Sequence, residues 1–451
     1  MYKLFKNILP ALFALLFAAA CDSKLDIEPT QSIDESNALA TSQDVQVTLI
    51  GAYAGLGDGD VLGGGIQYTS ELLGDNGEVN FGGTFSTLDE IWNKAITTSN
   101  AVVRDIWLDS YSTINRANNV LSALSVVDEA SREVVEGEAR FIRGVTYFSL
   151  INLFAKTWGD GDNNANPGVP LVITPTRAIT TEDYRSRASV QAVYTQIIED
   201  LTKAETLLPA TEESDDASRA TRIAASAMLS RVYLMQGRYA DARDAANKVI
   251  ANGARSLEGS FADVFATGGE SNEIIFRLAV SDQAGVNNMN TFYAPVAAQG
   301  RGDIYVTNKH LGLYEANDDR GDFFVEESGL VFSSKFLDQF ADVLVVRLAE
   351  MYLTRAECNQ RLGAAVGATP LADVNTIRAR AGLGALGTVN LAAILKERKL
   401  ELAFEGNQID DAKRTKTSVG ALPFNDNKLV LPIPQREIDT NKSLAQNPGY
   451  N

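Results

Sequence analysis

The sequence predicts a mainly α-helical protein of tetratricopeptide-like helix pairs, with long irregular loops and a small strand-containing insertion. Apolar residues recur every three or four positions through most of the 451 residues. From Gly237 onward, small residues are spaced as in a tetratricopeptide repeat, where alanine at a helix crossing allows close packing. Glycine-rich segments interrupt the period, and these predict the loops.

The predicted helices follow one another in pairs. The first helix is expected from about Asp44 to Leu56, after which nine glycines between residues 57 and 88 predict a long irregular loop. Further apolar stripes cover residues 107–121, 135–145, 193–208, 224–234, 239–249, 345–362, 371–381 and 391–405, the last with Gly406 as its C-cap. Residues 253–343 lack this rhythm and contain short strand-like pieces such as 273–278.

We therefore expect one domain over residues 21–451, preceded by a signal peptide at 1–20. A polar tether occupies residues 22–44, and the helical scaffold occupies 45–252 and 344–414. The irregular insertion at 253–343 is expected to pack on that scaffold.

The first twenty residues have the pattern of an export signal. Lys3 and Lys6 precede an apolar run from Ile8 to Phe17, which is too short for a membrane span. Three alanines then precede Cys21, a pattern that resembles a bacterial lipobox. The sequence thus predicts that Cys21 is lipidated and anchors the protein to a membrane. The alternative is ordinary cleavage after an Ala-x-Ala site, which would leave a free cysteine.

Charge limits the partners of the protein. Without the two leader lysines, 38 of the 40 basic side chains remain against 58 acidic ones, a net charge of about −20. Nucleic acid would be repelled, and a polyanionic ligand is disfavoured. This negative charge therefore favours a neutral ligand over an anionic one.

Several ordered motifs resemble the SusD/RagB family of outer-membrane nutrient-binding lipoproteins. The N-terminal motifs are Leu25–Pro29, Gly51–Tyr53, Glu71–Asn76, Tyr111–Asn118 and Glu138–Phe148. The C-terminal motifs are Arg347–Glu357, Asn375–Leu383, Glu397–Gly406, Leu431–Pro434 and Gln446–Tyr450. At Asn407-Gln408-Ile409 the chain departs from a common His/Arg-Trp pattern, so local packing is expected to differ there.

The resemblance implies about four helix pairs, a lipid anchor facing the cell exterior, and a SusC-like, TonB-dependent β-barrel transporter as partner. It implies capture of a glycan, or of an oligopeptide in some members, for delivery to that transporter. The alternative function is a tetratricopeptide-type scaffold that binds another protein.

Catalysis, cofactors and metals are not expected. Glu397, Glu401 and Glu405 share a helix face, but arginines such as Arg347, Arg378, Arg380 and Arg414 are available to pair with them. His310 is the only histidine, so a Ser/His or Cys/His dyad depends on it alone. Asp160, Asp162, Asn164 and Asn166 alternate as in a calcium loop, but the sharp-turn glycine and the closing glutamate are absent.

Loop aromatics carry the predicted ligand site. Sugar C–H faces stack on flat rings, while neighbouring carboxylates and amides bind hydroxyl groups. Phe85 and Phe292 are further candidate rings. The residues that we assign to ligand binding are Asp75, Asn76, Phe81, Trp92, Trp158, Tyr293 and Tyr305, in or beside loops at 57–92, 156–166 and 282–306.

Overall fold

The computed structural model describes residues 39–177, 180–210, 216–266, 270–280 and 287–450. The predicted signal peptide, Cys21 and residues 22–38 of the predicted tether lie outside the described residues. Within the described residues, no helix combines the length and the apolar character that a membrane span requires.

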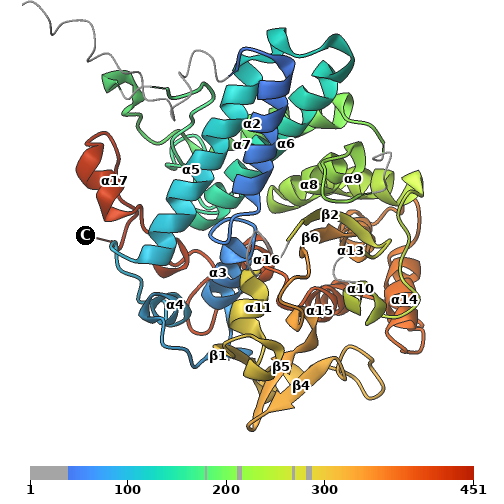
Figure 1. Ribbon diagram of the computed structural model, residues 1–451. Helices are drawn as coiled ribbons and strands as arrows, with labels where there is room; N and C mark the ends of the chain where they lie inside the picture. The colour runs from blue at the N-terminus through green and yellow to red at the C-terminus, as the bar shows by residue number, and fades with distance from the viewer. Residues whose placement is uncertain (1–38, 178–179, 211–215, 267–269, 281–286, 451) are drawn as a thin grey trace, which may run out of the picture.

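The body of the protein is an array of helices in which each helix packs on the next (Figure 1). The array consists of α2 (Ser42–Leu56), α5 (Ala101–Ser122), α6 (Glu129–Phe154), α7 (Val190–Leu207), α8 (Arg222–Met235), α9 (Tyr239–Asn252), α13 (Leu348–Leu362) and α14 (Pro370–Arg380). Helix α9 packs on α13 across the insertion that separates them in sequence. The predicted mainly helical fold is confirmed.

Side-chain caps fix where many of these helices begin. Thr41 and Asp44 form a reciprocal capping box at the start of α2. Other N-cap side chains accept a hydrogen bond from the first-turn backbone of α5, α7, α8 and α14; they are Asn100, Ser189, Thr221 and Thr369. After α8 and α9 the chain turns at Gly237 and Gly253, both with positive φ.

The insertion between α9 and α13 contributes two small sheets. Strands β1 (Val79–Phe81), β3 (Ile304–Val306), β5 (Leu330–Ser333) and β4 (Phe324–Glu327) form one sheet in that order. Strand β2 (Ile274–Leu278) pairs with β6 (Val343–Arg347) in the other. Short helix α10 (Asp263–Ala266) precedes β2, and α11 (Asn288–Tyr293) and α12 (Asn308–Leu311) flank β3. Because β1 comes from the early glycine-rich segment, that segment and the insertion build one structure.

The expectation of an irregular loop over residues 57–88 is wrong in part. Helix α3 (Gly65–Gly74) occupies its centre, and α4 (Ser86–Trp92) begins near its end. All ten residues of α3 are buried. The helix was missed because glycines precede and follow it closely, and the prediction assigned the whole glycine-rich segment to a loop.

The predicted C-terminal end of the last long helix is also wrong. Helix α15 (Leu391–Glu401) stops four residues before Glu405, and Phe404 has a positive φ of 67°. The ammonium of Lys335 donates to the carbonyl oxygens of Glu401 (3.1 Å) and Ala403 (2.9 Å), so a side chain from the insertion satisfies these groups. Two short helices, α16 (Gln408–Thr415) and α17 (Gln435–Thr440), follow.

A buried network of ion pairs joins the insertion to the helical array. Glu401 is fully buried and pairs with Arg347 at 2.5 Å, with Arg380, and with Arg320 at 3.4 Å. Arg347 and Arg380 both also pair with Glu273, which directly precedes β2. These contacts connect β2, β6, α14, α15 and the loop that carries Arg320.

The expected partners of the glutamate face are largely confirmed. Arg347 binds Glu401 and Glu405, and Arg378 lies 3.4 Å from Glu397. Arg414 is the exception, since it pairs with Glu357 and Asp411 instead. Cys358 is fully buried beside Leu234 and Ala242, as expected for a small hydrophobic residue, and burial raises the pKa of its thiol to about 12.

Removing the charge of Glu401 should destabilise the protein strongly. Glu401→Gln leaves the guanidinium groups of Arg347, Arg380 and Arg320 undercompensated in the interior, which we expect to lower the free energy of unfolding by about 3–5 kcal/mol. Chemical denaturation measures this change. Glu326→Gln, at an exposed position of β4, is the control. Equal stability of the two variants would contradict a structural role for the network.

Candidate ligand-binding face

Helix α3 is the base on which the candidate face is built. Its Gly74 lies against the backbone of α16, where an added Cβ would approach the Ile409 nitrogen to 2.5 Å. Next to this contact, one carboxylate oxygen of Glu71 accepts the backbone N–H groups of Gly406 (2.8 Å), Asn407 (3.0 Å) and Gln408 (3.4 Å). Glu71 therefore caps the start of α16 and fixes α3 to the C-terminal helices.

A buried polar chain connects β1 to the insertion. The His310 ring lies 2.9 Å from a Glu78 oxygen through Nδ1 and 3.0 Å from the Tyr314 hydroxyl through Nε2. Lys399 binds the other oxygen of Glu78. Burial raises the pKa of Glu78, but the hydrogen bond from His310 and the charge of Lys399 outweigh it and lower that pKa overall. The sole histidine thus holds α12 against the start of β1.

Asp75 organises the turn between α3 and β1. One of its oxygens accepts the backbone N–H groups of Glu78 (2.8 Å) and Val79 (3.1 Å), and the other accepts the indole N–H of Trp92 (3.2 Å). Asp75 is 8% exposed. Its assignment as a ligand contact is corrected to a positioning role, because both oxygens are engaged within the protein and hold the half-buried Trp92 ring. The side chain of the neighbouring Asn76 accepts the backbone N–H of Gly420 at 3.0 Å.

The pairing of β1 with β3 decides which rings point outward. Asn80 lies opposite Tyr305 and Phe81 opposite Ile304. Successive residues of a strand face opposite sides, so Asn80 and Tyr305 share the half-buried face, whereas Phe81 is buried. The expected exposure of the Phe81 ring is therefore wrong, and that of Tyr305 is confirmed in part.

A group of side chains at the rim of this sheet, which we call the Phe85–Arg301 cluster, has the chemistry expected of a sugar site. Phe85 is 44% exposed, and the Arg301 guanidinium lies 4.6 Å from its ring centroid. Arg301 also donates to Asp303 (2.8 Å) and to the Thr84 hydroxyl (3.2 Å). Tyr305 lies near this group because the intervening Gly82 has no side chain; a Cβ there would come within 2.9 Å of the tyrosine ring.

The cluster combines an exposed ring with groups that bind hydroxyls. The paired charges of Arg301 and Asp303 offset each other, so the cluster as a whole carries little net charge. A ring beside guanidinium, carboxylate and hydroxyl groups suits the apolar face and the hydroxyls of a neutral sugar.

Two other predicted aromatics lie elsewhere. Tyr293 is fully buried between Phe336 and Phe404, with centroid distances of 5.2 and 5.9 Å, so its expected exposure is wrong. It ends α11 and faces the core. Trp158 is half-buried and packs edge-on against Tyr194 of α7 at 5.1 Å. Trp158 therefore packs on the helical array, whereas Trp92 and Tyr305 lie beside β1 and β3.

The acidic loop after α6 forms a turn through hydrogen bonds. Asp162 accepts the backbone N–H of Asn164 at 2.9 Å, and Asn166 donates to the Asp160 carbonyl at 2.7 Å. The Asp160 carboxylate accepts the amide of Asn425 at 2.9 Å. These contacts hold the loop as a turn beside the segment that carries Asn425.

Sequence reasoning missed Arg301 and Asp303 as site residues. Both belong to the Arg-Gly-Asp tripeptide at residues 301–303. The available signal was the position of two opposite charges directly before the alternating strand that carries Tyr305.

Comparisons with known proteins agree with the fold. A family model described as "Starch-binding associating with outer membrane" matches residues 25–234, and a SusD family model matches residues 333–423. A SusD-like protein of Formosa agariphila is 26% identical, with 97% of this chain and 98% of the relative aligned. The chain belongs to the SusD/RagB family, whose members are associated with the outer membrane.

Solved structures show the same fold. A SusD superfamily protein from Bacteroides thetaiotaomicron is 24% identical and superimposes with a TM-score of 0.81, over 90% of this chain and 100% of the other. The surface glycan-binding protein A from Bacteroides uniformis is 22% identical, with a TM-score of 0.77 over 90% and 99% of the two chains.

Glu71 should make stability depend on pH. Burial raises the pKa of its carboxyl to about 8, although the three backbone N–H groups oppose this rise. The folded protein then holds a proton that the unfolded chain loses near pH 4.5, so this group's contribution to stability falls as pH increases from about 4.5 to 8. In Glu71→Gln, the melting temperature should decline less between pH 5 and pH 8 than in the native protein.

Glu90→Gln serves as the control for that measurement. Burial raises the pKa of Glu90, but hydrogen bonds from Asn100 and Thr97 lower it overall, so its titration lies below this pH range. The control should follow the native pH profile between pH 5 and pH 8. A Glu71→Gln profile parallel to the native one would show that Glu71 does not titrate there.

Proposed function

We propose that the protein is a cell-surface lipoprotein that binds a neutral oligosaccharide and delivers it to a TonB-dependent, SusC-like outer-membrane transporter. The single observation that supports binding most directly is the Phe85–Arg301 cluster, with an exposed ring beside offset charges. Membership of a family described as starch-binding agrees with a sugar ligand. The strong negative charge of the chain disfavours an anionic one.

The cluster suits binding without turnover. Its acid, Asp303, is buried and held by Arg301 at 2.8 Å, whereas glycoside cleavage uses two carboxyl groups on opposite sides of the scissile bond. Modest affinity serves a receptor that passes its cargo on, and millimolar to micromolar binding corresponds to about −4 to −8 kcal/mol.

An oligopeptide is the second candidate ligand, since the family resemblance admits it. The alternative function, a tetratricopeptide-type scaffold that binds another protein, would use the helical array, whereas the proposed receptor uses the face at β1, β3 and α4. Binding assays against both ligand classes separate the two proposals.

Replacing Phe85 tests the sugar site. Phe85→Ala should weaken binding of the preferred neutral glycan by about 1–3 kcal/mol, by analogy with other aromatic stacking platforms. Isothermal titration calorimetry against a panel of neutral glycans and oligopeptides measures this loss. Tyr184→Ala, which removes another exposed ring (40% exposed) in the segment between α6 and α7, is the matched control.

The Trp92 and Trp158 variants complete the panel. Trp92→Ala should weaken glycan binding to a similar extent and also lower the melting temperature, because the indole donates to Asp75. Trp158→Ala should weaken glycan binding if Trp158 is a second stacking platform. It should lower only the melting temperature if the ring merely packs on Tyr194. No binding by the native protein to any panel member, or product formation on incubation, would contradict the proposed function.

The anchor is tested at Cys21. We expect mass spectrometry of the native protein to find a chain that starts at Cys21 with attached acyl groups. Cys21→Ser should release the protein from membranes in cell fractionation, while Cys358→Ser leaves its location unchanged. An unlipidated chain that starts at Asp22 or later would exclude the anchor.

A further inference from the structure

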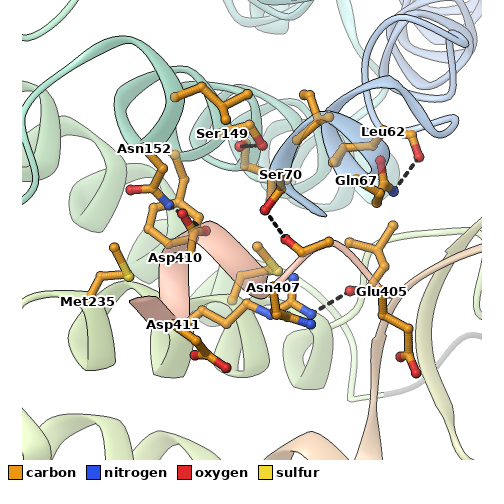
Figure 2. A pocket seen from close by; sticks show the side chains of 18 of the residues that line it. Leu62, Gln67, Ser70, Ser149, Asn152, Met235, Glu405, Asn407, Asp410 and Asp411 are labelled. Carbon is orange, nitrogen blue, oxygen red and sulfur yellow. Dashed lines mark hydrogen bonds between the residues drawn. The ribbon is translucent and has the colours of Figure 1, made fainter. Parts of the chain in front are cut away.

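A pocket separate from the Phe85–Arg301 cluster lies where α3, α6, α8 and α16 meet (Figure 2). Its volume is about 70 Å³. Apolar side chains cover much of its wall, including Leu62, Ile66, Phe148, Met228 and Met235. Polar side chains line it from three of the helices, and Figure 2 shows Gln67 beside Leu62 on one side and Asn152 beside Asp410 on the other.

Four side chains that line this pocket each carry a buried polar atom without a hydrogen-bond partner among the described residues. Two are acceptors, Gln67 Oε1 and Asp410 Oδ1, and two are donors, Asn407 Nδ2 and Arg414 Nη2. Gln67 is 5% exposed, and the Arg414 side chain is 3% exposed. A buried polar atom left unpaired is costly, so four in one pocket point to a guest that pairs with them.

Other contacts hold these side chains in place. The Gln67 amide donates to the Leu62 carbonyl at 2.8 Å, and the second oxygen of Asp410 accepts the amide of Asn152 at 3.1 Å. Arg414 binds Asp411 and Glu357, each at 2.6 Å. Rotating Gln67, Asp410 or Arg414 to satisfy its unpaired atom would break one of these bonds.

The size of the pocket limits the guest. Ligand pockets commonly measure about 300–1,000 Å³, so 70 Å³ is too small for a sugar ring. It accommodates about two to five water molecules. Water also supplies both donors and acceptors, as the mixed set of unpaired atoms requires.

We propose that this pocket binds a cluster of ordered water molecules that bridges α3 to α16. The waters donate to Gln67 and Asp410 and accept from Asn407 and Arg414. Burial raises the pKa of the Asp410 carboxyl to about 6, and waters at its unpaired oxygen would solvate the charged form. Because α3 also carries Glu71 and leads into the Asp75 turn, the cluster fixes the base of the candidate ligand-binding face to the helical array.

A crystal structure of the full chain at a resolution that defines waters decides the proposal. We expect waters within hydrogen-bond distance of at least three of the four atoms. A dry pocket, direct pairing of the four side chains with one another, or density for a solute other than water would overturn it.

Filling the pocket with a larger side chain gives a second test. The melting temperature should fall if the pocket holds water and rise if the pocket is dry. Ser149 lines the pocket, and its hydroxyl donates only within α6, to the Val145 carbonyl at 3.1 Å. Ser149→Leu should displace waters and lower the melting temperature by several degrees, while Ser149→Ala should stay within a degree or two of the native protein. A higher melting temperature for Ser149→Leu would mean that the pocket is dry, and would overturn the proposal.

Discussion

The arrangement of this protein depends on the buried charges around Glu401. Arg347, Arg380 and Arg320 reach this carboxylate from β6, α14 and the insertion, and all four side chains are nearly inaccessible to solvent. A charge in the interior is tolerated only with partners, so the elements that bring the partners cannot separate independently. These ion pairs attach the insertion to the helical array. Because the insertion carries β3, this attachment also positions the candidate ligand-binding face.

Sequence periodicity predicted the helical array because most of its helices bury one side only. It failed for α3, whose neighbouring glycines indicated a loop, and for the end of α15, where Lys335 from a distant segment binds the last carbonyl groups. In both segments the contacts that fix the structure come from residues far away in sequence, and these contacts leave no local sequence pattern.

The candidate site was predictable to a smaller extent. Two of the three segments that the sequence indicated contribute side chains to the candidate face, and the predicted Tyr305 and Trp92 are partly exposed. It could not separate them from Phe81 and Tyr293, because burial of a ring depends on strand register and on what covers it. The pairing of Arg301 with Phe85 joins segments more than two hundred positions apart in the chain, so only the folded structure reveals it.

The pairing of β1 with β3 also constrains how the chain acquires its structure. Glu78 contacts His310 across 232 positions, and Glu71 contacts Gly406 across 335. Contacts of such long sequence separation carry a large loop-closure cost and form late. The helices from α5 to α8 make mainly contacts with helices near them in sequence and can assemble before the C-terminal segments are available. The receptor surface is therefore completed last, after the C-terminal segments arrive, so a truncated chain would keep much of its helical content without a binding face.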